Sequence, residues 1–377
     1  MLRFGVIGLR RGQSFVRICQ AVGESEVTAL YDVDGETAAE VGSDIGAQAF
    51  TDLDKFLEAD IDAVVIASPL PYHARQAIAA LDAGKHVLSE VTACHTLEDA
   101  QALAAAADRS SAAYMMAENY RYLDEVELLK RLQDAGRFGD LYFGEGEYLH
   151  DCKDLWYSTT GELTWRGRGG LSVYCTHSLG PLLYITGDRV KSVSALTVPG
   201  AKFDASVDHP TMDLLQMVTD GGRTLRVRVD HVSPRPHQMA YYALQGTKGA
   251  FESWRGFGDE SKIWLGDVHE PSRVSGTGAQ WHSLTDFADE YIPERLAAPP
   301  EARQGGHGTS EYWLLQDFIA TIRGERAPSI DVHRALDYTL PGIYASASAG
   351  AGGVPQLVPN SRNFPAPLEE EMGVTTV

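Results

Sequence analysis

The sequence predicts an α/β protein with two domains, a doubly wound parallel sheet followed by an α+β domain with a mainly antiparallel sheet. The chain has 377 residues, which exceeds the roughly 250–300 residues at which one hydrophobic core usually stops growing. Strand and helix patterns alternate up to residue 119, and alternating apolar and polar runs joined by glycine-rich turns follow. We therefore assign residues 1–119 to the first domain and residues 120–377, with C-terminal helices, to the second.

The first domain alternates short apolar runs with amphipathic stretches. Its clearest strand is Ala-Val-Val-Ile-Ala at residues 63–67, which is short, apolar and β-branched. Strands separated by helices pair in parallel with right-handed crossovers, so helices cover both faces of such a sheet. The expected strands are residues 2–7, 26–31, 63–67 and 86–89, and the expected helices are residues 14–22, 35–45, 53–57, 73–83 and 97–107.

The second domain has a different pattern, because most of its apolar runs alternate with polar residues. Turns such as Asp220-Gly221-Gly222 join these runs, which is typical of antiparallel hairpins. Residues 280–308 contain several prolines and are expected to form a loop. The expected elements before this loop are a helix at residues 125–135 and strands at 141–149, 190–197, 213–218, 224–232, 239–244 and 250–253. After it, Thr309 or Ser310 is expected to cap a helix that ends near Arg323. Asp331 is expected to cap a last helix, which Pro341 interrupts.

Charge and cysteine content exclude several functional classes. Lys and Arg number 32 and Asp and Glu 52, which gives a formal net charge of −20. So acidic a chain lacks the basic footprint of a nucleic-acid binder, and an anionic membrane surface repels it. The four cysteines form no Cys-x-x-Cys pair and the histidines are scattered, so we expect no metal site and a reducing, cytoplasmic location. The longest uncharged run, residues 338–361, contains three prolines and is not a transmembrane helix.

A glycine-rich turn follows the first expected strand. The segment from Gly5 to Gly12 (GVIGLRRG) leads into a helix, and glycines there let the backbone approach a pyrophosphate at the helix N-terminus. Arg10 stands at one glycine position of the G-x-G-x-x-G pattern, so an ordinary strand-to-helix turn is the alternative. Asp32, at the end of the second expected strand, favours a dinucleotide site, because a carboxylate there binds the adenosine ribose diol and repels a 2′-phosphate. We therefore predict a Rossmann domain that binds NAD, with a solvated turn as the alternative for Asp32.

The loop from Ser68 to His73 (SPLPYH) follows the strand at residues 63–67. Ligands of open α/β sheets bind beyond the carboxyl ends of the strands, so this loop is expected to line the nicotinamide side of the site. A simpler interpretation of His73 is that it satisfies the start of the next helix. Glu90 is predicted to bind the cofactor or to support a strand end, and helix capping is its alternative.

Four segments resemble the Gfo/Idh/MocA family of NAD(P)-dependent sugar enzymes: GVIG at residues 5–8, ASPLPYH at 67–73, GKHVLSE at 84–90 and ENYRY at 118–122. The resemblance extends over nearly the whole chain. It implies a Rossmann domain plus a domain with an open antiparallel sheet whose face covers the nicotinamide, and a homo-oligomer, because exposed sheet faces in this architecture commonly pair. The predicted cofactor-binding residues are Gly8, Leu9, Arg10, Gly12, Gln13, Asp32, Ser68, Pro69, Leu70, His73, Glu90 and Asn119.

Two departures separate this chain from the dehydrogenases of that family. Those enzymes carry Glu-Lys-Pro, whose Lys relays the proton of the oxidised hydroxyl, where this chain has Glu90-Val91-Thr92. They also tend to carry an Asp four residues before a catalytic His, whereas Val173 precedes His177 here. A plain NAD-dependent sugar dehydrogenase is therefore the alternative interpretation, and a non-catalytic NAD- or sugar-sensing protein of the same fold is a third.

The sequence is more similar to the NAD-dependent glycosidases of the family, glycoside hydrolase family 109. The similar segments are GEYLHD at residues 146–151, YCTHSLGP at 174–181, QGTKG at 245–249 and GGHG at 305–308. The resemblance implies that Tyr148, Tyr174 and His177 face the sugar. Tyr291, which aligns less well, and Tyr120 are predicted to contribute to substrate binding.

The resemblance also implies a redox-neutral cycle. Bound NAD⁺ takes hydride from C3 of the sugar, a base removes the acidified C2 proton, the C1 substituent is eliminated, water adds, and the hydride returns. His177 is predicted to accept the C3 hydroxyl proton, because neutral imidazole accepts protons near pH 7. Tyr174 and Tyr148 are candidates for the C2 base or the leaving-group acid, although a tyrosine base, with an ordinary pKa of about 10, requires a nearby positive charge. Packing alone is the alternative role of each tyrosine.

Three cations, Lys153, Arg166 and Arg168, lie close in sequence to these tyrosines. An arginine presents a planar fork suited to an oxyanion, and Trp156 and Trp165 in the same stretch can stack on a sugar. We therefore predict an anionic hexoside as substrate, with sulfoquinovosides as the leading candidate because related glycosidases of this fold act on them, or else an N-acetylhexosaminide. The alternative is that these cations balance neighbouring acidic residues on a solvated loop.

Overall fold

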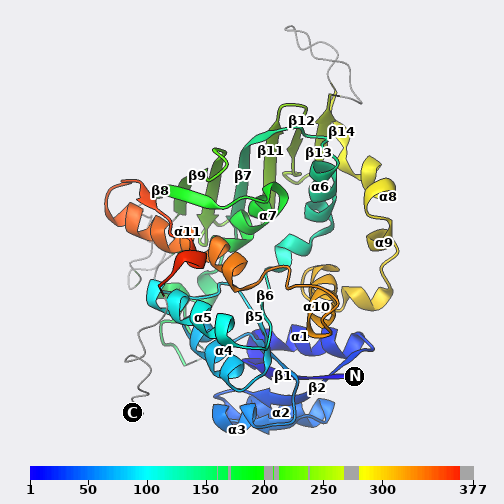
Figure 1. Cartoon of the computed structure of the whole chain (residues 1–377), viewed down its shortest axis with the longest axis vertical. Helices are drawn as coiled ribbons and strands as arrows, with labels where there is room; N and C mark the ends of the chain where they lie inside the picture. The colour runs from blue at the N-terminus through cyan, green and yellow to red at the C-terminus, as the bar shows by residue number, and fades with distance from the viewer. Residues whose placement is uncertain are drawn as a thin grey trace. The chain divides into compact units, whose positions relative to one another are not determined.

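The computed structural model describes residues 1–158, 160–168, 171–198, 207, 212–236, 238–266 and 280–365. The chain divides into two compact units (Figure 1). Unit 1 contains Met1–Ala117, Leu315–Asp337 and the described residues from 359, and unit 2 contains Glu118–Leu314 and Tyr338–Val358.

The composition of unit 1 differs from the sequence analysis, which assigns every residue after 119 to the second domain. Two C-terminal segments belong to unit 1 because they contact residues that lie far away in the sequence. The ring of Phe318 packs against that of Phe4 with centres 6.1 Å apart, and the Met116 N–H donates to the Ile330 carbonyl oxygen at 3.0 Å. No local sequence pattern reveals such contacts.

Unit 1 is built on six parallel strands in the order β3-β2-β1-β4-β5-β6, which confirms the predicted doubly wound sheet. All four residues of β4 are fully buried, which explains the unbroken apolar run there. The sequence analysis missed β3 and β6, which have only three residues each. The strands are β1 (Leu2–Ile7), β2 (Ser25–Tyr31), β3 (Gln48–Phe50), β4 (Ala63–Ile66), β5 (His86–Ser89) and β6 (Tyr114–Met116), and the helices are α1 (Leu9–Ala21), α2 (Gly35–Ile45), α3 (Leu53–Leu57), α4 (His73–Asp82) and α5 (Leu97–Arg109).

Unit 2 is built on a nine-stranded sheet in the order β14-β13-β12-β11-β7-β10-β9-β8-β15. Neighbouring strands are antiparallel except β7 and β10, which run parallel, so the predicted mainly antiparallel sheet is confirmed. The strands are β7 (Leu141–Leu149), β8 (Val190–Val198), β9 (Met212–Thr219), β10 (Thr224–Asp230), β11 (Gln238–Gly246), β12 (Gly249–Glu252), β13 (Lys262–Leu265), β14 (His282–Ser283) and β15 (Gln356–Leu357).

Helix α6 (Asp124–Asp134) matches its prediction closely, whereas α7 (Thr176–Thr186) was not expected at all. The residues of α7 are buried nearly all round, so no amphipathic period marks the helix in the sequence. It lies tightly against β7, because a Cβ atom on Gly146 would come within 2.1 Å of the Ser178 carbonyl oxygen. Glycine at this position therefore sets the close approach of α7 to the strand that carries Tyr148.

The C-terminal helices also differ from expectation in one respect. Helix α10 (Ser310–Ile322) begins as predicted, and Asp331 caps α11 (Val332–Gly350) by accepting the Arg334 N–H at 2.7 Å. However, α11 continues through Pro341, because buried residues on both sides, among them Leu336 and Ala345, hold the helix in place. Residues 280–308 form short helical segments, including α8 (Ala288–Tyr291) and α9 (Pro293–Leu296), rather than a plain loop.

Within the described ranges, no helix combines the length and the apolar character needed to cross a lipid bilayer.

Candidate functional site

The turn between β1 and α1 in unit 1 forms a cradle for a phosphate. Gly8 has a φ of 84°, and a Cβ atom there would lie 2.6 Å from the backbone nitrogen of Ser68, so only glycine fits. The N-cap residue of α1, Gly8, has no side chain to fill this end of the helix, and no acidic residue lies in the first turn of α1. Backbone N–H groups at the positive end of a helix dipole bind anions, which is the geometry that a dinucleotide pyrophosphate requires.

Asp32 lies just beyond β2 and is held in place by backbone hydrogen bonds. Its Oδ2 accepts from the Leu9 N–H at 2.7 Å, and its Oδ1 accepts from the Asp34 N–H at 3.0 Å. Each carboxylate oxygen has a second lone pair available for a ribose hydroxyl. Together with the glycine cradle, this arrangement fits the adenosine half of NAD.

The other residues predicted for the cofactor site differ in their exposure and in their contacts. Arg10 and Gln13 have exposed side chains on α1, whereas Leu70 is buried after β4. Ser68 donates its hydroxyl to Gln76 Oε1 at 2.5 Å, and Glu90 forms an ion pair with Arg11 Nη2 at 2.8 Å. Gly12 and Pro69 flank the cradle in sequence, and Asn119 belongs to unit 2.

His73 has a structural role in this arrangement. Its Nδ1 lies 2.9 Å from the Thr92 carbonyl oxygen and its Nε2 lies 2.8 Å from the Ser68 carbonyl oxygen. Burial lowers the pKa of His73, which keeps the imidazole neutral, so it donates to one carbonyl at a time. The buried ring ties together the loops that follow β4 and β5, and neither nitrogen is available to a cofactor. These side-chain contacts support the simpler, structural interpretation of His73, and its place among the cofactor-binding residues stays a prediction.

Unit 2 contains a cluster of aromatic and histidine rings that includes all three predicted catalytic residues. Tyr148 comes from β7, Tyr174 from the turn before α7, and His177 from the first turn of α7. The ring centre of His177 lies 5.2 Å from those of both tyrosines, which are themselves 5.9 Å apart. Tyr120, also predicted for the substrate site, stacks on His177 with ring centres 4.1 Å apart. We call these four rings the Tyr–His cluster.

His177 has a carboxylate partner that the sequence analysis did not identify. Its Nδ1 lies 2.7 Å from Oε1 of Glu118, and both side chains are buried. The same Oε1 accepts the Tyr120 N–H at 3.1 Å, which fixes the carboxylate in position. A carboxylate on Nδ1 orients the imidazole and stabilises it when it gains a proton at Nε2. The apolar Val173, four residues before His177, cannot act as a carboxylate partner of the histidine. Glu118, two residues after β6, provides that carboxylate instead.

Tyr148 is buried and bonded to a second histidine. Burial raises the pKa of Tyr148 well above its ordinary value, the neighbouring Tyr174 and Tyr120 add to the rise, and Arg166 opposes it. The hydroxyl lies 2.8 Å from Nδ1 of His150. Tyr148 is thus a neutral phenol with an imidazole nitrogen within hydrogen-bonding distance.

The structure separates the three predicted cations. The Arg166 guanidinium lies 4.9 Å from the ring centre of Tyr174 and 4.3 Å from that of Trp165, so it joins the Tyr–His cluster. Lys153 instead binds Asp151 at 2.5 Å and the Val232 carbonyl oxygen at 3.0 Å. The exposed Arg168 donates to the Leu163 carbonyl oxygen at 3.2 Å. The pairing of Lys153 with Asp151 matches the alternative role of charge balance, whereas the contact of Arg168 is with a backbone oxygen of its own loop.

Tyr291, also predicted for the substrate site, lies outside the Tyr–His cluster. Its hydroxyl accepts from Arg137 at 2.8 Å and its carbonyl oxygen from Arg131 at 2.5 Å, and it has no ring contact with the cluster in the described structure. The contacts with Arg131 of α6 and with Arg137, which follows α6, hold it there.

Four residues near the Tyr–His cluster were missed or given no role by the sequence analysis: Glu118, His150, His231 and His307. His231 lies 5.6 Å from the rings of both Tyr148 and Tyr174, and His307 lies 5.8 Å from that of Tyr120. His150 had a geometric signal, because residues i and i+2 of a strand share one face. Glu118 and His307 lie in the ENYRY and GGHG segments, which were quoted for the family resemblance alone. Among the described residues, no three His, Cys, Asp or Glu side chains are placed to hold a metal ion.

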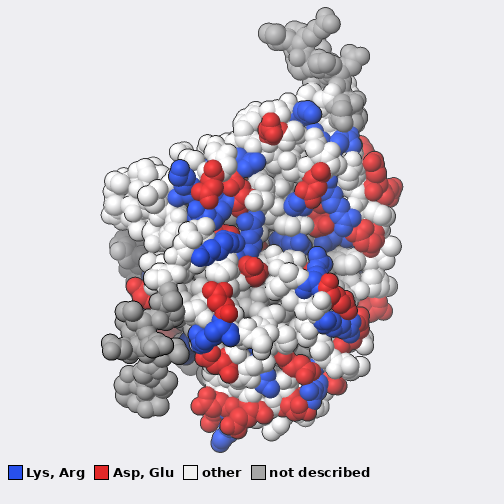
Figure 2. All heavy atoms as spheres, viewed as in Figure 1, with Lys and Arg blue, Asp and Glu red and all other residues white. Residues whose placement is uncertain are grey.

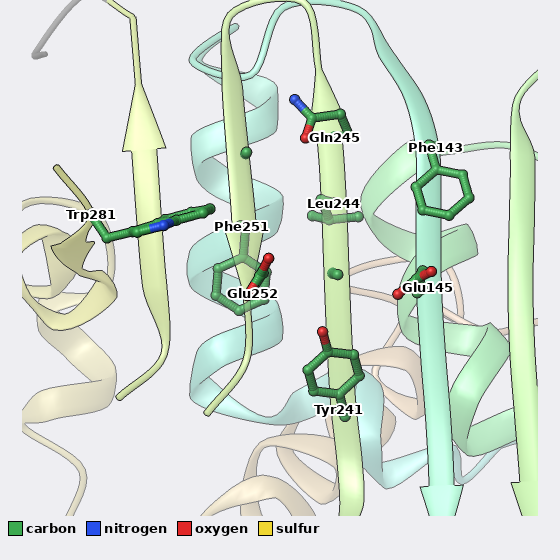
Figure 3. Close-up of a pocket in the computed structure, with 10 residues that line it drawn as sticks. Phe143, Glu145, Tyr241, Leu244, Gln245, Phe251, Glu252 and Trp281 are labelled. Carbon is green, nitrogen blue, oxygen red and sulfur yellow. The ribbon is translucent and has the colours of Figure 1, made fainter. Parts of the chain in front are cut away.

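Unit 2 has two hollows whose linings include none of the predicted site residues. One, of ≈ 220 Å³, lies on strands β7, β11 and β12, and its lining includes Phe143, Glu145, Tyr241 and Trp281 (Figure 3). The other, of ≈ 610 Å³, is lined in part by Glu125, Trp254 and Ile292. On the visible face of the molecule, basic side chains are interspersed with acidic ones, and no broad basic patch is present (Figure 2).

Two protein families match the chain, one on each side of residue 120. The NAD-binding Rossmann fold of the GFO_IDH_MocA oxidoreductase family matches residues 2–118, and the C-terminal domain of glycosyl hydrolase 109 matches residues 122–363. Proteins named glycosyl hydrolase family 109 protein from Saccharopolyspora erythraea and Streptomyces coelicolor are each 28% identical to the chain. The alignments cover 90% and 95% of this chain and 79% and 83% of the relatives.

Solved structures share the fold. The WlbA dehydrogenase from Bordetella pertussis, in complex with NADH and UDP-GlcNAcA, aligns with a TM-score of 0.77 and 22% identity, covering 95% of this chain and 98% of that one. A levoglucosan dehydrogenase in complex with NADH and levoglucosan aligns with a TM-score of 0.78 and 22% identity, covering 95% and 99%.

Proposed function

Because the chain belongs to glycosyl hydrolase family 109 and carries an NAD-binding Rossmann domain, we propose that it is an NAD-dependent glycoside hydrolase that transiently oxidises C3 of its sugar. The observation that carries the proposal is the Tyr–His cluster of unit 2. It combines a histidine backed by a buried carboxylate with two tyrosines, which are the proton-transfer groups that such a cycle needs. The missing Lys after β5 argues against a simple dehydrogenase.

The residues of unit 1 hold the cofactor. When bound, NAD supplies a reversible hydride acceptor for C3 of the sugar. The glycine turn and the positive end of α1 bind the pyrophosphate, and Asp32 binds the ribose diol through the lone pairs that its backbone bonds leave free.

The residues of unit 2 move the protons. His177 takes the C3 hydroxyl proton as the hydride leaves, and Glu118 stabilises the resulting imidazolium. The ketone at C3 acidifies the C2 proton, which Tyr148 removes. The C2–H electron pair then forms a C1–C2 double bond, and the C1–O bond breaks as Tyr174 protonates the departing oxygen. Water adds at C1 and gives its second proton to Tyr174, C2 regains its proton from Tyr148, and His177 returns its proton to the C3 oxygen as the hydride returns to C3.

The test of this cycle is an assay of aryl glycosides with added NAD⁺ in D₂O. We expect deuterium at C2 of the released sugar and no steady accumulation of NADH at 340 nm. The His177→Ala variant should lose most turnover but still bind NAD, because His177 lies outside unit 1. A product with C2 fully protonated would contradict the elimination. Steady NADH formation from free sugars would favour the alternative, a sugar dehydrogenase.

The proposed substrate is an anionic hexoside such as a sulfoquinovoside, with an N-acetylhexosaminide as the second candidate. Arg166 supports this choice, because its guanidinium lies beside Tyr174 in the Tyr–His cluster and can offer a fork to an oxyanion. Lys153 and Arg168 are occupied elsewhere and are not part of this proposal.

The substrate proposal is tested by Arg166→Met, with Arg168→Met as the matched control. For an aryl sulfoquinovoside, we expect kcat/KM of Arg166→Met to fall by the equivalent of about 1.5–3 kcal/mol, the usual contribution of a hydrogen bond to a charged group. The corresponding glucoside should be little affected, and Arg168→Met should resemble the wild type. Equal losses on neutral and anionic sugars, or a clear preference for the N-acetylhexosaminide, would rule out a sulfonate clamp.

A further inference from the structure

His150 directly follows β7 and lies on the same side of the strand as Tyr148. The strand pairing continues one residue beyond β7, because the His150 N–H donates to the Asp230 carbonyl oxygen at 2.9 Å. Residues i and i+2 of an extended strand project their side chains to the same face. This local geometry brings Nδ1 of His150 to 2.8 Å from the Tyr148 hydroxyl.

A chemical difficulty in the proposed cycle concerns Tyr148 itself. A phenol takes up a proton from carbon only if it loses its own proton beforehand or at the same time. Burial keeps Tyr148 protonated, and the opposing influence of Arg166 does not reverse this. The only hydrogen-bond partner of the Tyr148 hydroxyl among the described residues is His150.

We propose that His150 is the positioning residue that makes Tyr148 a base, by accepting the hydroxyl proton on Nδ1 as the tyrosine oxygen takes the C2 proton. This inference rests on the proposed function. The tyrosine ends the step neutral, His150 ends it as imidazolium, and the C2–H electron pair drives elimination at C1. When water has added at C1, Tyr148 returns a proton to C2 and His150 returns its proton to Tyr148, so no charge accumulates over the cycle.

The competing explanation is that His150 only packs against Tyr148. The two rings meet edge to face with centres 5.6 Å apart, and His231 contacts Tyr148 at the same centre distance of 5.6 Å and in a similar orientation. His231 makes no hydrogen bond to the Tyr148 hydroxyl. The two histidines therefore form a matched pair that separates ring packing from proton transfer.

The experiment compares His150→Gln with His231→Gln on an aryl glycoside that carries deuterium at C2. For His150→Gln we expect kcat to fall about 10²-fold or more, as for the loss of a general base, and the C2 isotope effect on kcat to rise. In a single turnover, reduced cofactor should build up at 340 nm, because C3 oxidation depends on His177 and continues. His231→Gln should keep the wild-type isotope effect, and imidazole should partly restore a His150→Ala variant.

A direct measurement of the histidine tautomer does not depend on turnover. In ¹⁵N NMR spectra of the wild-type protein, we expect His150 to carry its proton on Nε2 and none on Nδ1, with the signal assigned by its loss in His150→Gln. A proton on Nδ1 would overturn the proposal even if the variants failed to fold.

The possible failures are distinguishable. If the wild type shows neither C2 exchange nor transient cofactor reduction, the proposed function fails and this inference fails with it. If the wild type shows both and His150→Gln retains the wild-type kcat and isotope effect, the inference about His150 alone fails.

Discussion

At the residue scale, the pair of Glu118 and His177 is the feature with the largest expected effect on turnover. We predict that Glu118→Gln lowers kcat about 10²-fold or more with a much smaller change in KM, because the amide accepts the Nδ1–H but does not stabilise the imidazolium. Steady-state kinetics on the preferred aryl glycoside measure this. Glu311, a buried carboxylate 3.0 Å from Nδ1 of His307, provides the control. An equal loss in Glu311→Gln would point to a general effect of removing a buried charge.

Sequence reasoning identified residues of the site unevenly. Tyr148, Tyr174 and His177 were predicted through motifs, and Asp32 through its place after a strand. Glu118 was not, because its contact with His177 joins residues 59 positions apart in the sequence. The sequence also did not show which of the three cations lies beside the rings of the Tyr–His cluster. Arg166 lies there, whereas Lys153 and Arg168 have other partners.

At the scale of elements, one buried carboxylate connects α6 to its neighbours. Glu127 accepts from Arg131 Nε at 2.9 Å and from the Tyr184 hydroxyl of α7 at 3.0 Å, and Arg295 of α9 lies 3.7 Å away. Burial alone would raise the pKa of Glu127, but the charges of Arg121 and Arg295 and these hydrogen bonds outweigh it and hold the pKa below its ordinary value. The ionised form therefore stabilises the folded state above the unfolded pKa of about 4.3.

We predict that Glu127→Gln lowers the free energy of unfolding at pH 7 by about 1–3 kcal/mol, because buried arginines lose their charged partner. The contribution is lost as pH falls through the lowered pKa of Glu127, so the difference from the wild type should shrink below about pH 4. Urea denaturation at pH 7 and at pH 3 measures both values. A difference that is the same at the two pH values would exclude an electrostatic origin.

Elements were predictable where their pattern is local. Strands β1 and β7 and helices α2 and α3 have the expected bounds, because their apolar periods and flanking residues are visible in short windows. Helix α7 was missed because its surroundings bury nearly all its sides, and α11 runs through Pro341 because packing compensates for the lost hydrogen bond. Both exceptions arise from tertiary contacts rather than from local propensity.

At the scale of the whole molecule, unit 1 depends on residues that lie nearly 200 positions after its first segment ends, from Leu315 onward. Phe318 is fully buried and packs on Phe4 of β1. We predict that Phe318→Ala destabilises the protein by about 3–5 kcal/mol, as is usual when a buried aromatic ring is removed. Thermal unfolding with and without NAD measures the effect, and unchanged stability would show that α10 is dispensable to the core of unit 1.

The interleaved order of segments has a consequence for protein synthesis. A ribosome makes the chain from the N-terminus, and domains that are continuous in sequence fold as they emerge. Unit 1 cannot do so, because its sheet is complete at residue 117 but the residues that cover Phe4 appear only after the whole of Glu118–Leu314 has been made. The apolar surface that awaits Phe318 is thus exposed during translation for about 10–40 s at ordinary elongation rates. In a cell, this interval is when the nascent chain depends most on chaperones, and slower elongation upstream of residue 315 should lower the yield of folded protein.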